Sequence, residues 1–182
     1  MTAPVLETPR LLLRSWRESD LDGFAALMAE RDAARFLAHD GQPMDRTTAW
    51  WHMSLLVGHW SLRGFGLFVV EEKASGAWVG RVGPWRPEGW PGFEIGWALR
   101  KPFWGKGYAT EAAIAAGAWA LARFAPDRII ALIHEDNRAS HAVARRLNMA
   151  PGERMTHAGQ PHTVWGVTGR NWPAAAEPVA RL

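Results

Sequence analysis

Residues 93–111 read FEIGWALRKPFWGKGYATE, and the rest of the chain is organised around this stretch. Its first half is rich in apolar residues and lies between Pro91-Gly92 and Pro102, which predicts a strand. A turn at Gly105-Lys106-Gly107 follows, and a helix is predicted from Tyr108 to about Phe124. The N–H groups of such a turn and of the first helical turn lack helical partners, and the helix dipole favours negative charge there. The stretch therefore predicts a site for a ligand that carries phosphate.

Length and composition indicate an ordinary globular protein. The 182 residues predict a single domain at 1–170, followed by a C-terminal tail at 171–182. The sequence contains no run of 18 apolar residues, and the first ten residues lack the apolar core of a signal peptide. Because there is no cysteine, disulfides, thiol nucleophiles and thiolate metal sites are excluded. We expect a cytoplasmic protein that does not bind membranes.

The charged residues give little sign of a macromolecular partner. The formal net charge is +3, which serves solubility or attracts a small polyanion. No basic stripe stands out, so we expect no nucleic acid partner. The seven histidines show no metal-binding spacing, so we expect no metal.

The remaining elements alternate between strands and helices, which predicts an α/β fold. Strands are predicted at 10–16, 65–72, 78–85, 93–99 and 128–134, and in a hairpin over 154–168. Helices are predicted at about 19–29, 32–37, 45–63, 108–124 and 137–147. Ser19 or Asp20 is the expected N-cap of the first helix, and strands two to four are expected to form an antiparallel meander.

Two familiar phosphate-binding loops fit the glycine turn poorly. The Walker motif G-x-x-x-x-G-K-[ST] does not occur in the chain. The dinucleotide motif G-x-G-x-x-G would need glycine where Thr110 stands, and the acidic residue after the next strand comes too late.

The motifs do resemble one known family. The strings EIGWAL and FWGKGYATEA, preceded by TPRLLLRSW and followed by HEDNRASHAVARRLNM, are similar to the GNAT superfamily of acetyl-coenzyme-A-dependent N-acetyltransferases. Within it, they look most like the Rim-type branch, and the resemblance spans residues 8–168. It implies a GNAT-type acyl-CoA N-acyltransferase fold, with a mixed, twisted central sheet of six to seven strands and helices on both faces. It also implies acetyl-CoA as the acetyl donor and makes a homodimer plausible.

The resemblance also assigns the residues that bind the coenzyme. Pro102 stands where the family often has Arg or Gln, so one side-chain contact is missing, whereas the backbone amides that cradle the phosphates are unaffected. Arg100 and Lys101 are either solvated charges or direct coenzyme contacts. The expected coenzyme-binding residues are Ala98, Leu99, Gly105, Lys106, Gly107, Tyr108, Ala109, Thr110, Asn137 and Ser140.

Two residues are candidates for the chemistry of transfer. Glu94, near the start of the central strand, is either the general base that takes a proton from the acceptor amine or an ordinary strand residue that faces outward or pairs with an arginine. Ser140 is the candidate donor to the leaving sulfur, and Asn137 either caps a helix or binds the pantetheine arm. Many relatives carry a tyrosine acid at the position occupied here by Ala144.

Several other residues lie near the predicted site, and we expect structural roles for the first of them. Glu111 lies in the first turn of the helix, where a carboxylate complements the dipole. His134 ends a buried strand, and His141 lies on the following helix. Trp85, Trp90 and Trp104 flank the central strand and could wall an apolar acceptor pocket.

The expected reaction is direct attack of a primary amine on acetyl-CoA in a ternary complex. Two alternatives remain at this point: a coenzyme-A-binding sensor that has lost catalysis, and a protein that binds a nucleotide through the same turn. The sequence does not identify the acceptor, which is a protein N-terminus, a small amine, an amino acid or an antibiotic.

Overall fold

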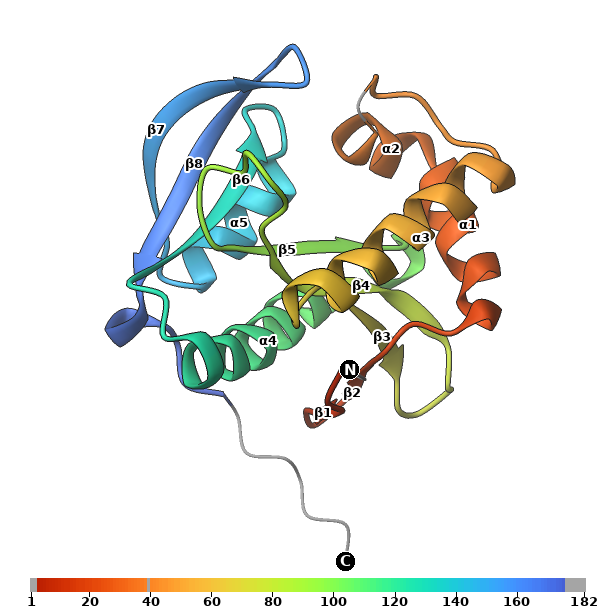
Figure 1. Ribbon diagram of the computed structural model, residues 1–182, viewed down its shortest axis with the longest axis horizontal. Coiled ribbons are helices and arrows are strands. Elements are labelled where there is room, and N and C mark those ends of the chain that lie inside the picture. The colour runs from red at the N-terminus through yellow and green to blue at the C-terminus, as the bar shows by residue number, and fades with distance from the viewer. Residues whose placement is uncertain (1–2, 39, 176–182) are drawn as a thin grey trace, which may run out of the picture.

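The computed structural model describes residues 3–38 and 40–175. These residues form one eight-stranded sheet in the order β1-β2-β3-β4-β5-β6-β8-β7, with helices packed on both faces (Figure 1). The strands are β1 (Leu6–Glu7), β2 (Leu11–Arg14), β3 (Phe68–Glu72), β4 (Trp78–Trp85), β5 (Glu94–Leu99), β6 (Arg128–His134), β7 (Ala150–His157) and β8 (Gln160–Thr168). The helices are α1 (Leu21–Ala29), α2 (Arg31–Leu37), α3 (Arg46–Arg63), α4 (Tyr108–Phe124) and α5 (Arg138–Arg146).

The α/β prediction is confirmed, and the strand count is corrected. The seven strands expected from the pattern are present, and the short β1 pairs with β2 to make an eighth. A two-residue strand carries too little alternation to be predicted from sequence. Strands β2 to β5 run antiparallel, as the meander prediction required.

The sheet opens between β5 and β6. These two strands are parallel and pair at Glu94 and Ile130, where the Ile130 N–H also donates to the Phe93 carbonyl at 2.9 Å. Two residues further on, the Leu132 N–H donates to the side chain of Glu94 instead of to a backbone carbonyl. On its other edge, β6 pairs with β8 along its whole length. The predicted parting of two parallel strands is thus confirmed.

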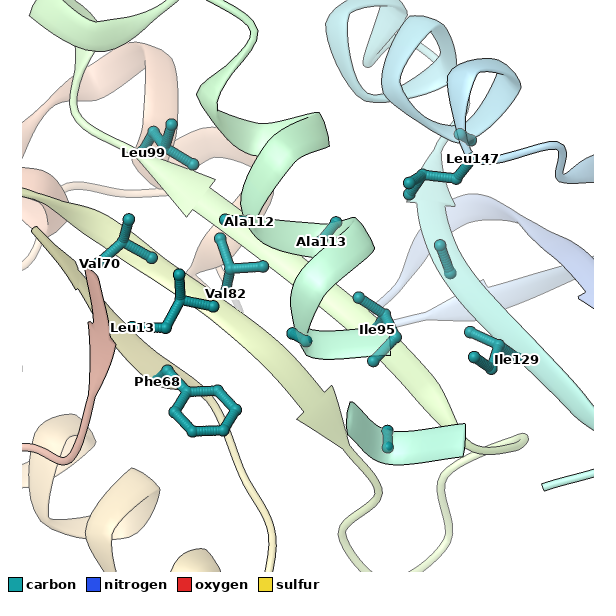
Figure 2. Packing of buried hydrophobic residues seen from close by; sticks show 14 of the residues in the cluster. Leu13, Phe68, Val70, Val82, Ile95, Leu99, Ala112, Ala113, Ile129 and Leu147 are labelled. Atoms are coloured by element: carbon teal, nitrogen blue, oxygen red, sulfur yellow. The ribbon is translucent and has the colours of Figure 1, made fainter. Parts of the chain in front are cut away.

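The elements that flank this opening have the predicted bounds. Helix α4 begins after Gly107 and ends at Ala125, whose φ of 45° stops the helix. Four of its alanines have no exposed surface, which lets the helix approach the strands closely; they are Ala112, Ala113, Ala116 and Ala120. Figure 2 shows Ala112 and Ala113 above the apolar side chains of β4 and β5, with Ile129 and Leu147 continuing the core toward α5.

The opposite face of the sheet has its own core. Phe24 and Leu27 of α1 and Met53 of α3 pack there against Leu67 and Ala98. Because side chains alternate along a strand, Ala98 faces α1 and α3 while its neighbour Leu99 faces α4. The end of β5 is therefore enclosed from both sides.

Two predictions about local structure need refinement. Asp20 is the N-cap residue of α1, as predicted, but its carboxylate makes no cap hydrogen bond to that helix. It pairs instead with Arg14 at 2.7 Å, and Arg14 also contacts Glu71. A buried guanidinium demands such partners more strongly than a helix end does. In the predicted tail, Trp172 packs against Gly117 of α4 and donates to the Ile114 carbonyl at 3.1 Å. Residues 176–182 of that tail lie outside the described residues.

Candidate active site

The glycine turn has the geometry that an anion cradle needs. Gly105 and Gly107 have φ angles of 75° and 80°, a region that other residues rarely adopt. Gly107 is also the N-cap of α4, so the first N–H groups of that helix point out of its end without helical partners. The absence of a Cβ at both glycines leaves the backbone open to a bulky anion.

The N-terminal segment braces this turn. The Arg10 guanidinium donates to the Lys106 carbonyl at 2.9 Å and forms an ion pair with Glu111 at 2.7 Å. The Thr8 hydroxyl donates to the same carboxylate at 2.6 Å. Glu111 thus has a structural role through Arg10 and Thr8, which the sequence did not predict, while its predicted effect on the helix dipole stays a prediction. Arg10 was not anticipated, because nothing in its local sequence points to a loop almost 100 residues away.

Arg100 and Lys101 face α2. Arg100 lies 3.5 Å from Glu30, and the Lys101 ammonium lies 2.7 Å from Asp32. These ion pairs hold the start of α2 beside the glycine turn. Arg100 and Lys101 are thus ion-paired, which the sequence did not predict, and neither residue lines the cavity described next.

A cavity of about 800 Å³ lies between the glycine turn, the end of β5 and the start of α5. The structure brings every predicted coenzyme-binding residue to its wall, namely Ala98, Leu99, Gly105, Lys106, Gly107, Tyr108, Ala109, Thr110, Asn137 and Ser140. Tyr108 turns its hydroxyl away to donate to Glu72 at 2.5 Å, so it contributes backbone and ring to the wall. Trp104 also lines this cavity and anchors itself on the Leu99 carbonyl at 2.6 Å.

Asn137 and Ser140 are arranged for two tasks at once. The side-chain oxygen of Asn137 caps α5 by accepting a hydrogen bond from the Ser140 N–H at 3.0 Å, which confirms the N-cap prediction. The Asn137 amide nitrogen remains available to a ligand in the cavity. The indole N–H of Trp97 donates to the Ser140 hydroxyl at 3.1 Å. Because that oxygen already accepts a hydrogen bond, its own proton is directed to another acceptor. Ala144, at the position of the absent tyrosine acid, is fully buried.

Glu94 sits where β5 and β6 separate. Only 8% of its surface is exposed, and its carboxylate accepts from the Trp90 indole N–H at 2.5 Å and from the Leu132 N–H at 3.3 Å. Burial raises the pKa of Glu94 to about 7, although these two hydrogen bonds and the charge of Arg81 oppose the rise. The prediction of an outward-facing strand residue is wrong for Glu94. A carboxylate with a pKa near neutrality is suited to take and release protons.

A second cavity of about 390 Å³ lies between the end of α2 with its following loop and the tip of the β7–β8 hairpin, two segments that Figure 1 shows facing each other. Four histidines of the described ranges line it: His52, His134, His157 and His162. The ring of His162 lies 5.3 Å from that of His134 and 5.4 Å from that of His157. These residues come from three separate parts of the sequence, so no spacing rule could have grouped them.

The two cavities adjoin, since both are lined by Arg35, Phe36, Leu37 and Asp136. Glu94 lines neither cavity directly. Its partner Trp90 contacts the ring of His157 at 4.9 Å between centroids, which places the carboxylate one side chain away from the second cavity. Trp85 stacks on His59 at 4.3 Å, and neither Trp85 nor Trp90 lines the second cavity.

The other histidines considered from sequence have different surroundings. The Nδ1 atom of His134 accepts from the Asp136 N–H at 3.0 Å, which is a structural contact at the edge of the second cavity. His141 stacks on Trp165, and burial lowers its pKa. Within the described ranges, no group of three or more His, Asp or Glu side chains could hold a metal ion. In the same residues, every helix is too short or too polar to cross a bilayer.

Comparison with known proteins agrees with this geometry. Residues 10–150 match the Acetyltransferase (GNAT) domain family. The uncharacterized protein YkkB of Bacillus subtilis is 28% identical over 168 residues, which cover 88% of this chain and 93% of YkkB. The crystal structure of an acetyltransferase from Agrobacterium tumefaciens superposes with a TM-score of 0.80 at 26% identity, covering 92% of this chain and 95% of that one.

Rim-type enzymes share the fold at lower identity. RimJ of Mycobacterium smegmatis, solved in complex with CoA-disulfide, superposes with a TM-score of 0.71 at 19% identity and covers 96% of this chain and 90% of its own. The ribosomal-protein-S5-alanine acetyltransferase of Vibrio fischeri gives a TM-score of 0.70, also at 19% identity, covering 94% of this chain and 100% of its own. The chain belongs to the GNAT acetyltransferase family, whose members transfer acetyl groups from acetyl-CoA, and Rim-type ribosomal-protein acetyltransferases are among its structural neighbours.

Proposed function

We propose that this protein transfers the acetyl group of acetyl-CoA to a primary amine, with Glu94 as the general base. The observation that carries the proposal is the position of Glu94, a buried carboxylate with a pKa of about 7, at the parting of β5 and β6, on the strand whose other end lines the predicted coenzyme cavity. The glycine turn fits the donor, because its outward N–H groups and its lack of Cβ atoms suit a diphosphate. When bound there, acetyl-CoA supplies an activated thioester.

Glu94 provides what the acceptor needs. An amine with a pKa of about 8 to 10 is largely protonated at neutral pH and cannot attack a carbonyl in that state. The Glu94 carboxylate takes one ammonium proton, directly or through water, and releases it to solvent after the reaction. The N–C bond to the acetyl group forms, the C–S bond breaks, and the second N–H proton converts the departing thiolate to the thiol. Since the chain has no cysteine, no acetyl-cysteine can carry the group between the two substrates.

Ser140 and Asn137 assist at the other end of the transferred group. The Trp97 indole fixes the Ser140 oxygen, so the Ser140 O–H donates a hydrogen bond to the departing sulfur. Asn137 holds the pantetheine arm through its amide nitrogen, while its oxygen fixes the start of α5. A thiol has a reference pKa of about 8.5, so a hydrogen-bond donor suffices and a stronger acid is not required.

The second cavity is the proposed entrance for the acceptor. It adjoins the coenzyme cavity and reaches Trp90, the partner of Glu94, through His157. Its volume of about 390 Å³ suits a small amine or the first residue of a chain end.

The test is the release of coenzyme A from acetyl-CoA in the presence of a panel of amines, detected with a thiol reagent. The protein contains no cysteine, so the reagent reports released coenzyme A alone. We expect release that depends on both an amine and Glu94. A protein that binds acetyl-CoA yet releases none with any amine would instead be the non-catalytic sensor, the second candidate. The family assignment favours coenzyme A over a nucleotide as the ligand.

A further inference from the structure

Arg81 is a partly buried cation that the mechanism above does not use. It lies in the middle of β4, opposite Val69 of β3 and Ala98 of β5. Directly paired residues share a face of the sheet, so Arg81 lies on the same face as Ala98 and, four residues earlier on β5, Glu94. This is the face covered by α1 and α3.

The guanidinium lacks a partner of its own. Its Nε atom is enclosed and has no hydrogen bond, and within the described ranges Arg81 forms no ion pair. Burial lowers the pKa of Arg81 to about 10, which the distant charge of Glu94 only partly offsets. A guanidinium that is enclosed on one side is normally paired there, because taking a charged N–H out of water without a partner is costly. The contrast with Arg14, which pairs with both Asp20 and Glu71, shows how the same fold treats a purely structural arginine.

Arg81 lines neither cavity, but its charge reaches two residues of the proposed acceptor side. His52 lines the second cavity, and the charge of Arg81 contributes, after burial, to lowering the pKa of that histidine. The same charge lowers the pKa of Glu94. Arg81 therefore lies within electrostatic range of His52 in the second cavity and of Glu94, the proposed base.

The surface of the sheet between Arg81 and Glu94 carries no side chain. The facing residues between Arg81 and Glu94 on this side of the sheet are Gly83 and Gly96. A Cβ on Gly96 would lie 3.7 Å from the Glu94 carboxylate and 3.6 Å from Leu67, whereas a Cβ on Gly83 would lie only 2.7 Å from the Gly66 carbonyl oxygen. The open part of this surface is therefore at Gly96, with Leu67 as an apolar wall. Four residues along a strand span roughly 13 Å between Cα atoms, and two long side chains at the ends shorten the gap to the size of a small molecule.

We propose that Arg81 binds a carboxylate of the acceptor, and that the acceptor is a small amino carboxylic acid. Its ammonium faces Glu94 and its carboxylate faces the guanidinium, which matches carboxylate geometry with two parallel hydrogen bonds. The inference rests on the proposed function and narrows it. Polyamines are disfavoured because their second cation would meet Arg81, and a protein N-terminus offers an amide carbonyl where the carboxylate is needed.

The experiment compares the twenty free amino acids with the corresponding amino acid amides as acceptors, in the coenzyme A release assay. It is run at pH 9, above the pKa of Glu94, so that a change in that pKa does not disturb the comparison. The variants are Arg81→Met, Arg81→Lys and, as a matched loss of one positive charge, Arg123→Gln on the exposed end of α4.

We expect the best wild-type acceptors to be free acids, with kcat/KM about 100-fold above their amides. Arg81→Met removes that preference by lowering kcat/KM for the acids alone, Arg81→Lys retains part of it, and Arg123→Gln matches wild type. Equal use of acids and amides by wild type, or an equal loss for both in Arg81→Met, would overturn the inference while the proposed acetyl transfer stands. If no coenzyme A is released with amino acids, with their amides or with any simple amine, the proposed function itself is contradicted.

Discussion

The pH dependence of a Glu94→Gln variant tests the role of the proposed base. Burial lifts the pKa of Glu94 from 4.5 to about 7. That shift corresponds to about 3 kcal/mol of preference for the neutral carboxyl group. The upward direction of this pKa shift determines how activity depends on pH. Because Glu94 acts as a base only when it is ionised, activity is lost as the pH falls through 7. Above pH 7, wild-type kcat/KM is expected to level off, because the carboxylate can take the ammonium proton at any higher pH.

Without the carboxylate, the Glu94→Gln variant can use only the fraction of the amine that is already neutral in solution. For an acceptor with a pKa of about 10, only about one molecule in 1,000 is neutral at pH 7. Glu94→Gln is therefore expected to be roughly 100- to 1,000-fold slower than wild type at pH 7, within the usual range for general-base catalysis. The deficit shrinks about tenfold for each pH unit and nearly disappears at pH 10.

The assay measures initial rates of coenzyme A release between pH 5.5 and 10 for wild type, Glu94→Gln and Glu88→Gln. Glu88 is a suitable control because it lies in the same β4–β5 connection, and its side chain is 97% exposed beside Arg63. Its loss should leave the profile unchanged. A deficit in Glu94→Gln that is the same at every pH, or smaller than tenfold at pH 7, would refute the reasoning.

Three further predictions concern the coenzyme cavity and the core. Gly107→Val places a branched side chain at a φ of 80° in the anion cradle and should abolish the rise in Tm that coenzyme A gives wild type. The control Gly76→Val, at a φ of 69° in the β3–β4 turn, should keep that rise. Ser140→Ala removes the proposed donor to sulfur and should lower kcat about tenfold while leaving the affinity for coenzyme A, measured by calorimetry, within about twofold. Leu13→Ala empties a position with no exposed surface and should lower the free energy of unfolding by about 2 to 5 kcal/mol in urea titrations, with the m-value unchanged.

The elements around the coenzyme cavity could be predicted because their signals are local. Helix α4 has a glycine at its N-cap and a turn after Phe124, and β6 is an apolar run of strand length. The glycine turn, Asn137 and Ser140 lie directly at the junctions of these elements. Their arrangement around one cavity follows once the strands and helices are in order.

The acceptor side could not be predicted because its parts meet only through tertiary packing. His52, His134 and His157 belong to α3, β6 and β7, and no sequence period relates them. Arg81 looks like any strand residue until the structure shows that its enclosed Nε atom has no hydrogen-bond partner among the described residues. Asp20 carried a true helix-start signal, yet its contact with Arg14 outweighed the local preference.

The most direct test of acetyl transfer is a mass balance on one reaction mixture. Wild-type protein is incubated with acetyl-CoA and a mixture of amino acids and amines, and both released coenzyme A and acetylated amine are measured. We predict one equivalent of N-acetylated amine for each coenzyme A released, and no release without an amine. Stabilisation of the protein by acetyl-CoA with no acetylated product in any mixture would contradict the account and leave a coenzyme-binding protein without catalysis.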